Sequence, residues 1–213
     1  MRLLVLDHPL ARVAVTELRD QRTPTAGFRQ AADRLATLLA VEATRSLASV
    51  PQPVTTPVGE TVGARLAAPA LLVPVLRAGA GLLPAFTRLC PEAAVGFVGL
   101  ARDEHTLRAD WYLDRVPADL QARPVLVLDP MIATGGTLAE VLRLLAGRGA
   151  RAVTVAALIA APEGLRAVET VAPDLPLDLT VVTAAVDERL DGRGFIVPGL
   201  GDAGDRMFGT EPA

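Results

Sequence analysis

The chain has 213 residues, 51% of them apolar, and a formal net charge of −3. This length fits one domain with a substantial hydrophobic core, and the apolar content argues against intrinsic disorder. Acidic and basic residues are mixed along the chain, which argues against a nucleic-acid-binding protein, because such proteins neutralise phosphates with a basic face.

The rare residue types exclude several kinds of site. The chain contains no lysine, so neither a Walker-type phosphate loop nor a lysine Schiff base can form. The only serines, Ser46 and Ser49, have no nucleophile-elbow context, which argues against a serine hydrolase. Two histidines and Cys90 lie far apart in the sequence, so we do not expect a His/Cys metal centre.

The same composition bears on where the protein works. No stretch of eighteen residues is both apolar and uncharged, so we expect no membrane span. Residues 1–10 are too short and too interrupted for a signal peptide. One cysteine excludes an internal disulfide and suits a reducing compartment. We therefore expect a cytoplasmic protein with no membrane partner.

The first half of the chain alternates between helix and strand signals. Apolar residues recur at helical spacing over residues 28–47, which predicts a helix. Residues 52–68 carry mixed signals with several prolines, and we expect extended chain there. A short apolar run at residues 70–76 predicts a buried strand that leads into a glycine-rich loop at residues 77–81. Residues 82–89 are the candidate for the helix that follows.

The middle of the chain contains a long polar excursion. Residues 94–100 read as another short strand. Residues 102–123 are rich in charge and hold the only Trp and Tyr, Trp111 and Tyr112. A segment of this length is either a hairpin on the surface or a mobile flap, and the sequence favours neither.

The clearest strand–helix alternation follows. The pattern predicts strands over residues 124–128, 152–159 and 177–183, with helices over residues 137–147 and 163–171. The strands are almost continuously apolar, which is typical of a parallel sheet covered by helices on both faces.

The strongest local signal for chemistry lies at residues 127–137, which read VLDPMIATGGT. An apolar strand ends in Asp129, and a loop of small residues then opens a helix. Backbone N–H groups of such a loop, together with the helix N-terminus, bind a phosphate dianion well. Asp129 stands at the carboxyl end of the strand, where a ribose hydroxyl or a metal-bound ligand would lie.

This segment resembles the phosphoribosyl-diphosphate (PRPP) loop of type I phosphoribosyltransferases. Two adjacent acids precede the loop in most of them, whereas here Pro130 replaces the second, as in the uracil phosphoribosyltransferases. Other stretches that resemble this family, in the family's order over nearly the whole chain, are VEAT at 41–44, PVLRAGAG at 74–81, RDEHTL at 102–107, AAPEG at 160–164 and FIVPGLGDAGDRMFGT at 195–210.

The resemblance implies an α/β fold of the type I phosphoribosyltransferase kind, in which helices flank a mostly parallel central sheet. It implies one domain over residues 1–213, with a flexible flap at about residues 102–123 and a uracil-binding hood at about residues 184–210. The implied enzyme transfers the 5-phosphoribosyl group of PRPP to N1 of uracil, which yields UMP and pyrophosphate in pyrimidine salvage.

The resemblance also implies roles for individual residues. Arg77 resembles the arginine that binds the pyrophosphate half of PRPP, and Arg102 resembles a second PRPP contact at the base of the flap. The loop residues implied in binding the ribose hydroxyls and the 5-phosphate are Asp129, Pro130, Met131, Ile132, Ala133, Thr134, Gly135, Gly136 and Thr137.

A second group of residues resembles the uracil pocket. It consists of Ile196, Gly201, Asp202 and Ala203. Asp202 is also expected to help place PRPP and its Mg²⁺, mainly through PRPP itself. Arg77, Asp129 and Asp202 are therefore the residues that we expect to carry the reaction.

Elementary chemistry agrees with these roles. Pyrophosphate departs more easily where positive charge stabilises it, and Arg77, Arg102 and magnesium can supply that charge without a lysine. A flap that excludes water would protect an oxocarbenium-like ribose from hydrolysis. Backbone N–H and C=O groups near Ile196 can distinguish uracil from cytosine, because the wrong base leaves buried polar groups unpaired. No side chain stands out as a general base.

The sequence departs from the family pattern at three positions: Ala101 and Val41 replace frequent tyrosines, and His105 replaces a usual acid in the flap. Alternative interpretations are a PRPP-sensing regulator with the same fold, a bifunctional regulator of pyrimidine genes, or a phosphoribosyltransferase for another base; the Asp-Pro loop argues against most other bases. The intact loop and Arg77 argue against the first, and the low basic charge argues against the second. The family resemblance further implies a homodimer or larger homo-oligomer and, in some members, activation by GTP.

Overall fold

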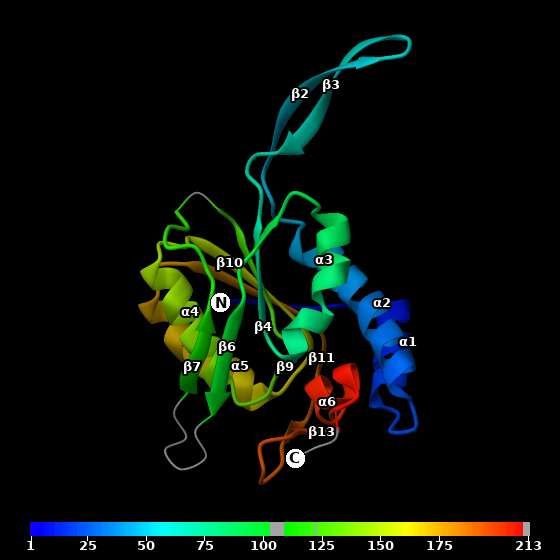
Figure 1. Cartoon of the computed structure of the whole chain (residues 1–213), viewed down its shortest axis with the longest axis vertical. Coiled ribbons are helices and arrows are strands. Elements are labelled where there is room, and N and C mark those ends of the chain that lie inside the picture. Colours follow the sequence, from blue (N-terminus) through cyan, green and yellow to red (C-terminus); the bar gives the residue numbers. More distant parts are fainter. Residues whose placement is uncertain (103–108, 122, 211–213) are drawn as a thin grey trace.

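The computed structural model describes residues 1–102, 109–121 and 123–210, and the side chains of residues 102 and 109 are outside this description. The tip of the expected flap, including His105, therefore lies outside the described residues. At the centre of the molecule is one large sheet, with helices on both sides of it (Figure 1).

The strands of this sheet run parallel except at one edge. Every neighbouring pair along the main path is parallel except β6 and β7. Short strands β5 (Ala94–Val95) and β9 (Met131–Ile132) add to β4 and β10. In spatial order the main strands are β1 (Arg2–Val5), β11 (Asp178–Val186), β10 (Ala152–Ala160), β8 (Val125–Leu128), β4 (Leu71–Leu76), β6 (Val98–Arg102) and β7 (Ala109–Asp114). The predicted mostly parallel α/β fold is thus confirmed.

Helices cover both faces of the sheet. On one face α1 (Pro9–Arg19), α2 (Thr25–Ala43) and α3 (Leu83–Leu89) pack over one cluster of buried residues; on the other, α4 (Gly136–Gly147) and α5 (Pro162–Val171) pack over a second cluster (Figure 1). Single-turn 3₁₀ helices, η1 (Ala78–Gly81) and η2 (Ala172–Asp174), follow β4 and α5. The central strands β4 and β8 are buried along almost their whole length. Their apolar runs, without alternation, follow from this two-sided burial.

The predicted helices form with shifted ends. The helix expected over residues 28–47 begins at Thr25 and ends at Ala43, where the Thr44 hydroxyl bonds back to the Ala40 carbonyl at 2.7 Å. Leu138, Val141, Leu142 and Leu145 of α4 are all buried, as expected from their spacing.

Two N-terminal elements were not predicted. Strand β1 is a mostly exposed edge strand, and its short apolar run is no stronger than chance. Helix α1 does carry a signal: Ala11, Ala14, Val15 and Leu18 recur at helical spacing and are buried, and the His8 imidazole caps the helix by accepting from Leu10 N–H at 3.1 Å. Small alanines made this stripe weak in the sequence.

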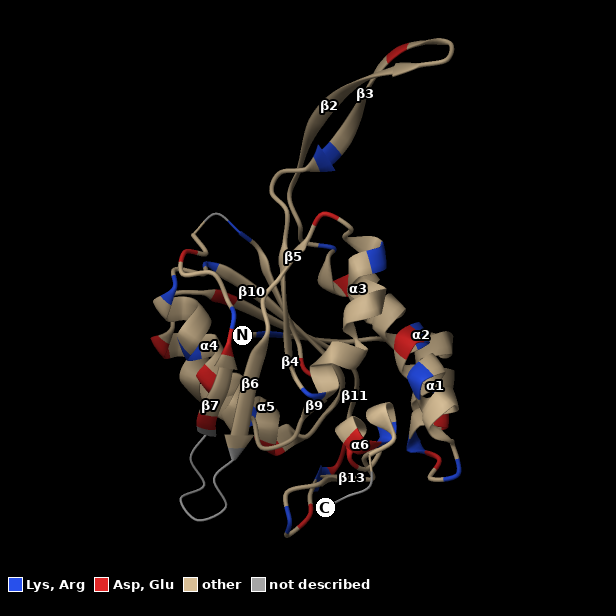
Figure 2. Ribbon diagram, viewed as in Figure 1, with Lys and Arg blue, Asp and Glu red and all other residues tan. Residues whose placement is uncertain are grey.

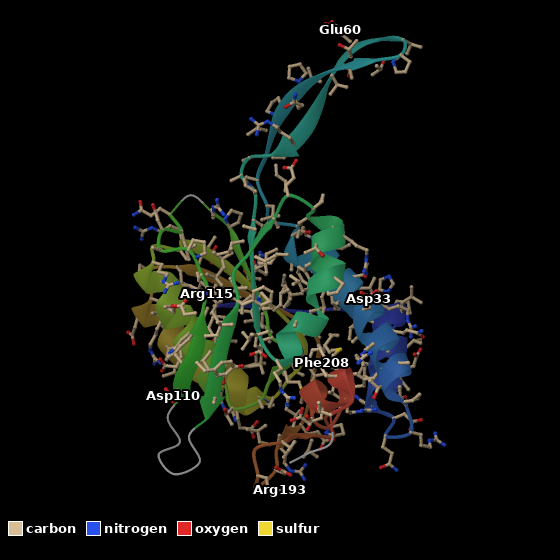
Figure 3. All side chains as sticks on the ribbon, viewed as in Figure 1. Asp33, Glu60, Asp110, Arg115, Arg193 and Phe208 are labelled. Carbon is tan, nitrogen blue, oxygen red and sulfur yellow. The ribbon has the colours of Figure 1, made fainter. Side chains whose placement is uncertain are left out.

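The segment expected to be extended chain is an antiparallel hairpin, β2 (Ser49–Thr56) and β3 (Gly59–Leu66). We call it the arm. It projects well away from the sheet, with Glu60 near its tip (Figures 1 and 3). Nearly all its residues are exposed, and its only charged residues are Glu60 and Arg65, as Figure 2 shows.

The described part of the expected flap is a hairpin on the sheet edge. Strand β7 pairs antiparallel with β6, and the chain after it packs on the core, because Val116 and Leu120 are buried. The Arg148 guanidinium also donates to Asp114 and to the Val116 carbonyl. Residues 109–121 are therefore held against the sheet and against the end of α4.

Candidate active site

The candidate site lies where two neighbouring strands end. Strands β4 and β8 pair in parallel, and Arg77 and Asp129 directly follow them. The chain leaves β4 through α3 toward β6 on one side, and leaves β8 through α4 toward β10 on the other. Such a reversal of strand order opens a crevice at the carboxyl ends of the strands, where ligands of open α/β sheets bind.

A cavity of about 290 Å³ occupies this crevice. We call it the phosphate half of the site. Its lining residues are Val75, Leu76, Arg77, Ala78, Leu100, Asp129, Met131, Ile132, Ala133, Thr134, Gly135, Thr137, Leu138, Asp202 and Gly204.

The loop after β8 is built as an anion cradle. It contains β9, which pairs with β10, and it ends at Gly135, whose φ of +77° is the left-handed conformation that glycine adopts readily. Helix α4 then starts without a side-chain cap and without an acidic residue in its first turn. Its first N–H groups and the positive end of its dipole therefore face the crevice free of a competing carboxylate from that turn.

A second stretch of backbone supports this loop from behind. Gly164, in the first turn of α5, lies so close that a Cβ on it would be 2.4 Å from the Ala133 carbonyl oxygen. A Cβ on Gly135 would in turn be 2.5 Å from the Gly164 carbonyl oxygen. Gly164 belongs to the AAPEG stretch, so its place in the family pattern has a packing reason.

Two residues of the predicted loop do not line the crevice. Pro130 is buried, and its carbonyl accepts from Leu158 N–H at 2.9 Å, which ties the loop to β10. Gly136, the first residue of α4, is exposed, and its atoms are not among those that line the cavity. The other seven residues predicted there line the cavity.

Asp129 lies at the floor of the site. Burial of its carboxylate raises its pKa to about 7, and a hydrogen bond from Met131 N–H opposes that rise only in part. The cause is desolvation, which disfavours the charged form of an acid. A carboxyl group poised near neutrality in a crevice is typical of a functional site.

Arg77 stands at the mouth of the site, with its side chain 58% exposed. Its guanidinium donates to Asp205 at 3.0 Å and to the Thr210 hydroxyl at 3.3 Å. Asp205 has its pKa lowered, first by the hydrogen bond from Thr210 and then by that from Arg77. Asp205 was missed in the sequence analysis, although it stands in the same GDAGDR stretch as Asp202.

A second cavity, of about 230 Å³, adjoins the first. We call it the base half of the site. It is bounded on one side by the C-terminal hood, which consists of β12 (Arg189–Leu190), β13 (Ile196–Val197) and α6 (Ala203–Phe208). The lining residues are Ala78, Asp129, Met131, Ala133, Gly194, Phe195, Ile196, Gly201, Asp202, Ala203 and Gly204.

The two cavities are halves of one cleft. Both are lined by Ala78, Asp129, Met131, Ala133, Asp202 and Gly204. All four residues predicted for uracil, Ile196, Gly201, Asp202 and Ala203, line the base half. Met131 and Ala133, predicted only for PRPP, line both, and the neighbouring Gly194 and Phe195 were not predicted. Apolar periodicity could not predict Gly194 and Phe195, because they lie in a short turn.

Packing brings the hood against the strand ends. Met207 of α6 contacts η1 so closely that a Cβ on Gly81 would be 2.5 Å from its sulfur. A Cβ on Gly204 would be 3.2 Å from Asp202 Oδ1 and 3.7 Å from Arg77 Nη2. Asp202 caps α6 by accepting from Asp205 N–H at 2.9 Å, and it lines both halves of the cleft. Arg77 and Asp202, 125 positions apart in number, thus line the same cavity as Asp129.

Arg102 ends strand β6, whose Leu100 lines the phosphate half, but the side chain of Arg102 is outside the described part of the chain. Among the described residues, no three His, Cys, Asp or Glu side chains gather closely enough to hold a metal ion by themselves. Within the same residues, none of the helices is long and apolar enough to cross a membrane.

Residues 5–210 match the uracil phosphoribosyltransferase family. Relatives named uracil phosphoribosyltransferase include one from Kineococcus radiotolerans, 58% identical, and one from Beutenbergia cavernae, 57% identical; each match covers 99% of this chain and 100% of the relative. The solved structure of the AQ2163 protein from Aquifex aeolicus is 36% identical with a TM-score of 0.89, over 99% of this chain and 100% of that one. A hypoxanthine-guanine phosphoribosyltransferase from Bacillus anthracis shares the fold, with a TM-score of 0.52 at 14% identity over 76% of this chain and 80% of that one.

Proposed function

The chain belongs to the uracil phosphoribosyltransferase family and transfers the phosphoribosyl group of PRPP to uracil, and we propose that the two-part cleft is where this transfer occurs. One observation carries the proposal. An anion cradle and a second cavity meet at six shared residues, with Asp129 between them. A ribose held at the junction would present its C1′ atom to the base half and its phosphate groups to the other.

The phosphate half suits PRPP. The 5-phosphate accepts hydrogen bonds from backbone N–H groups of the loop and of the first turn of α4, while Thr134 and Thr137 line the same cavity. Asp129, when ionised, accepts from the ribose hydroxyls. Arg77 leaves Asp205 to bind the pyrophosphate half, since a guanidinium pairs well with phosphate oxygens.

Magnesium fits this site as a companion of PRPP. Asp202 and Asp129 supply hard oxygen ligands at the cleft, and magnesium commonly uses one or two carboxylates together with substrate phosphates. When bound with PRPP, magnesium supplies positive charge that stabilises the departing pyrophosphate.

The reaction then needs little covalent chemistry from the protein. The bond from C1′ to the pyrophosphate oxygen breaks, the bond from N1 of uracil to C1′ forms, and N1 loses its proton. Arg77 stabilises the negative charge that develops on the leaving group. The hood holds uracil with backbone groups around Ile196 and Gly201, which match its two carbonyls and its N3–H. The N1 proton passes to the departing pyrophosphate or to water, and no residue is assigned as its acceptor.

A panel of bases tests the function. Purified protein is incubated with PRPP, magnesium and, in separate reactions, uracil, cytosine, orotate, adenine, guanine or hypoxanthine, and nucleotide and pyrophosphate are both measured. We expect UMP from uracil and discrimination against cytosine on the order of 10⁴. Turnover with another base would keep the phosphate half and refute the base half. Binding of PRPP without any turnover would favour a PRPP-sensing regulator.

We expect PRPP use to depend on the ionisation of Asp129. Its pKa in the free protein is about 7, so the accepting carboxylate is mostly protonated at pH 6 and mostly ionised at pH 8. We therefore expect kcat/KM for PRPP to rise by about tenfold between these pH values. Asp129→Asn should lose on the order of 10²-fold in kcat/KM and lose this rise, because the amide does not titrate. The measurement is a pH profile of both proteins.

The same raised pKa predicts a stability effect of defined sign. The folded protein holds a proton on Asp129 that the unfolded chain releases at lower pH, so unfolding becomes easier as the pH rises from about 4 to about 7. Asp129→Asn should lack this loss of stability and should unfold at a higher temperature than the native protein at pH 8. Equal pH dependence of both proteins would contradict the assignment of the pKa to Asp129.

The arm supports the expected homodimer. A two-stranded hairpin is marginally stable alone in water, and the arm has no other element of its own chain along most of its length. Its register places Pro51, Pro53, Thr55, Glu60, Val62 and Ala64 on one face and Val50, Gln52, Val54, Thr61, Gly63 and Arg65 on the other. On the first face the pairs Pro51–Ala64 and Pro53–Val62 form an apolar stretch, and we infer that this stretch packs on a second copy of the chain.

Val62→Asp tests this inference, with Thr61→Asp on the opposite face as the matched control. We expect Val62→Asp to shift the protein toward monomer in sedimentation at micromolar concentration, because it would bury a charge in the interface. Thr61→Asp should leave the assembly unchanged. A native protein that sediments as a monomer would refute the arm as a homodimer contact.

Activation by GTP stays a prediction without assigned residues. We place the enzyme in the cytoplasm, where its single cysteine stays reduced.

A further inference from the structure

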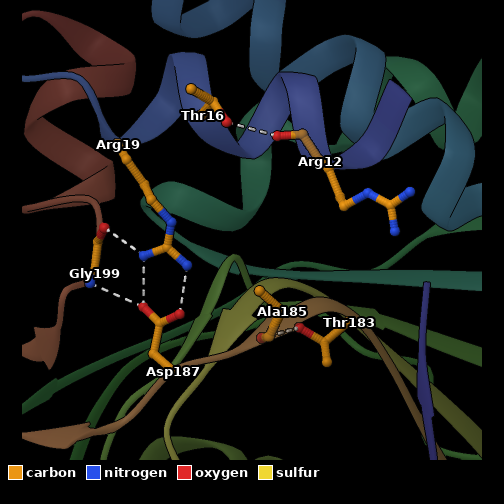
Figure 4. A network of polar contacts seen from close by, with 7 residues as sticks. All are labelled: Arg12, Thr16, Arg19, Thr183, Ala185, Asp187 and Gly199. Atoms are coloured by element: carbon orange, nitrogen blue, oxygen red, sulfur yellow. Dashed lines mark hydrogen bonds and ion pairs between the residues drawn. The ribbon is translucent and has the colours of Figure 1, made fainter. Parts of the chain in front are cut away.

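An ion pair between Arg19 and the buried Asp187 lies beside Gly199 of the hood (Figure 4). Asp187 directly follows β11, and its side chain is only 3% exposed. Arg19, the last residue of α1, pairs with it: Nη1 donates to Asp187 Oδ2 at 2.8 Å, and Nη2 donates to Oδ1. Neither residue lines the cleft, and neither belongs to the stretches that resemble the family motifs.

This pair binds the backbone of the hood at one residue, Gly199. Asp187 Oδ2 accepts from Gly199 N–H at 2.8 Å, and Arg19 Nη1 donates to the Gly199 carbonyl at 3.0 Å. One ion pair thereby fixes both the N–H group and the carbonyl group of Gly199. Asp187 is itself anchored to the sheet, because its N–H donates to the Ala160 carbonyl of β10 at 2.8 Å.

Gly199 lies in the turn from Ile196 to Gly201, at a position that leaves no room for a side chain. Its φ is +64°, and a Cβ on it would lie 2.0 Å from the Ile196 carbonyl oxygen. Ile196 and Gly201, on either side of Gly199, both line the base half of the cleft. A shift of Gly199 must therefore move the Ile196 carbonyl and the Gly201 backbone, which are the groups that would read the base.

A second arginine holds the next residue from the same direction. Arg206 donates from Nη1 to the carbonyls of Leu200, at 2.8 Å, and Leu18, and from Nη2 to the Asp20 carbonyl at 2.7 Å. Its guanidinium also lies 4.5 Å from the Phe28 ring centroid. Two successive hood carbonyls, those of Gly199 and Leu200, are thus fixed by arginines that connect them to the end of α1.

Resting on the base half proposed above, we propose that Arg19 and Asp187 are positioning residues for uracil: they hold the turn from Ile196 to Gly201 in the shape that binds uracil and rejects cytosine. Neither touches the substrate. The N-terminal helix, which has no residue in the cleft lining, thereby becomes part of the specificity apparatus. The carboxylate is suited to this task because one Asp187 oxygen accepts from both Gly199 and Arg19.

Asp187→Asn is the direct test. The asparagine keeps the shape of the side chain, but an amide N–H group must replace one oxygen and would face a donor, either Arg19 or Gly199. We expect KM for uracil to rise about tenfold or more, since a misplacement of 1 Å in a site costs on the order of 10²-fold. The ratio of kcat/KM for uracil over cytosine should fall, whereas KM for PRPP should change less than about twofold.

A conservative variant and a matched control complete the design. Arg19→Lys keeps the positive charge beside buried Asp187, so it folds, but it loses the planar fork that reaches Asp187 and Gly199 together; we expect an intermediate rise in KM for uracil. Arg12→Gln alters an arginine of the same helix that is 68% exposed, pairs with Asp7 and points away from the network (Figure 4). It should change neither KM.

Ala133→Leu separates failure of the inference from failure of the base half. Ala133 lines both halves of the cleft, on the loop opposite the hood, and a larger side chain there should raise KM for uracil. If Ala133→Leu does so while Asp187→Asn and Arg19→Lys lower only the unfolding temperature, the pair is merely structural and the inference is wrong. If Ala133→Leu leaves KM for uracil unchanged, the base half is misplaced and the inference is wrong with it.

Discussion

Replacement of Arg77 by alanine is expected to lower kcat/KM for PRPP by about 10²- to 10³-fold, the range found when one group that stabilises developing charge is removed. Arg77 is the described arginine that lines the phosphate half of the cleft. The chain has no lysine that could take over its role. Initial rates with varied PRPP at saturating uracil give the measurement.

The fold should survive this replacement. The Arg77 side chain is 58% exposed, and its described partners, Asp205 and Thr210, lie on the C-terminal segment rather than in the core. Exposed pairs of this kind contribute about 0–1 kcal/mol to stability. We therefore expect an unchanged unfolding temperature within a few degrees, and an activity loss without a stability loss.

Two further variants sharpen the interpretation. Arg77→Lys should recover only part of the activity, because an ammonium group cannot bind two phosphate oxygens with a planar fork. Asp205→Asn removes the resting partner of Arg77, so PRPP should bind at least as well as before. If Arg77→Ala kept kcat/KM within threefold of the native value, the pyrophosphate would have to bind elsewhere.

Gly135→Ala is the second change with a large expected effect. Gly135 has φ of +77°, and a Cβ there would lie 2.5 Å from the Gly164 carbonyl oxygen and 3.0 Å from the Ala167 Cβ. The left-handed conformation alone costs a non-glycine residue about 1–2 kcal/mol. The closest atom belongs to backbone at the start of α5 and cannot rotate away. The cradle must therefore open, and we expect PRPP binding to fall by at least about 10²-fold.

The stability of the Gly135→Ala variant gives a second, independent measurement of the strain at this position. A total cost of about 2–4 kcal/mol in the free energy of unfolding would lower the unfolding temperature by about 5–15 °C for a chain of this size. Gly147→Ala at the other end of α4 is the control, because a Cβ there meets no atom within 4 Å. Alanine favours helix over glycine, so this variant should be neutral or slightly more stable. Equal behaviour of the two variants would show that the loop tolerates a Cβ at Gly135.

Much of the phosphate half could be predicted from the sequence. The strand, the loop and α4 follow one another between residues 125 and 147, so apolar periodicity and two adjacent glycines were enough to identify them. Local backbone groups make the cradle, and β10 and Gly164 of α5 support it from outside the segment. The family motifs extended this to Ile196 and to Gly201–Ala203, which do line the base half.

Other features depend on contacts that no local pattern contains. The hairpin pairing of the arm joins two proline-bearing segments with weak strand signals. Helix α1 was not predicted, because the buried residues along its one face are mainly small. Pro130 and Gly136 were assigned to PRPP with their neighbours, whereas the fold uses Pro130 to tie the loop to β10. A motif does not distinguish residues that line a site from residues that shape it.

The sequence by itself therefore determined the family, the parallel α/β fold and the phosphate loop, because these depend on periodicity and on residues that are neighbours in the chain. Only the tertiary structure decided how the cleft closes. Folding brings the hood over the ends of β4 and β8, so that Asp202, Arg77 and Asp129 line one cavity. It also buries Asp187 against Arg19, 168 positions away. Such pairs form through packing and desolvation. Both depend on how close residues lie in space and not on how close they stand in the sequence.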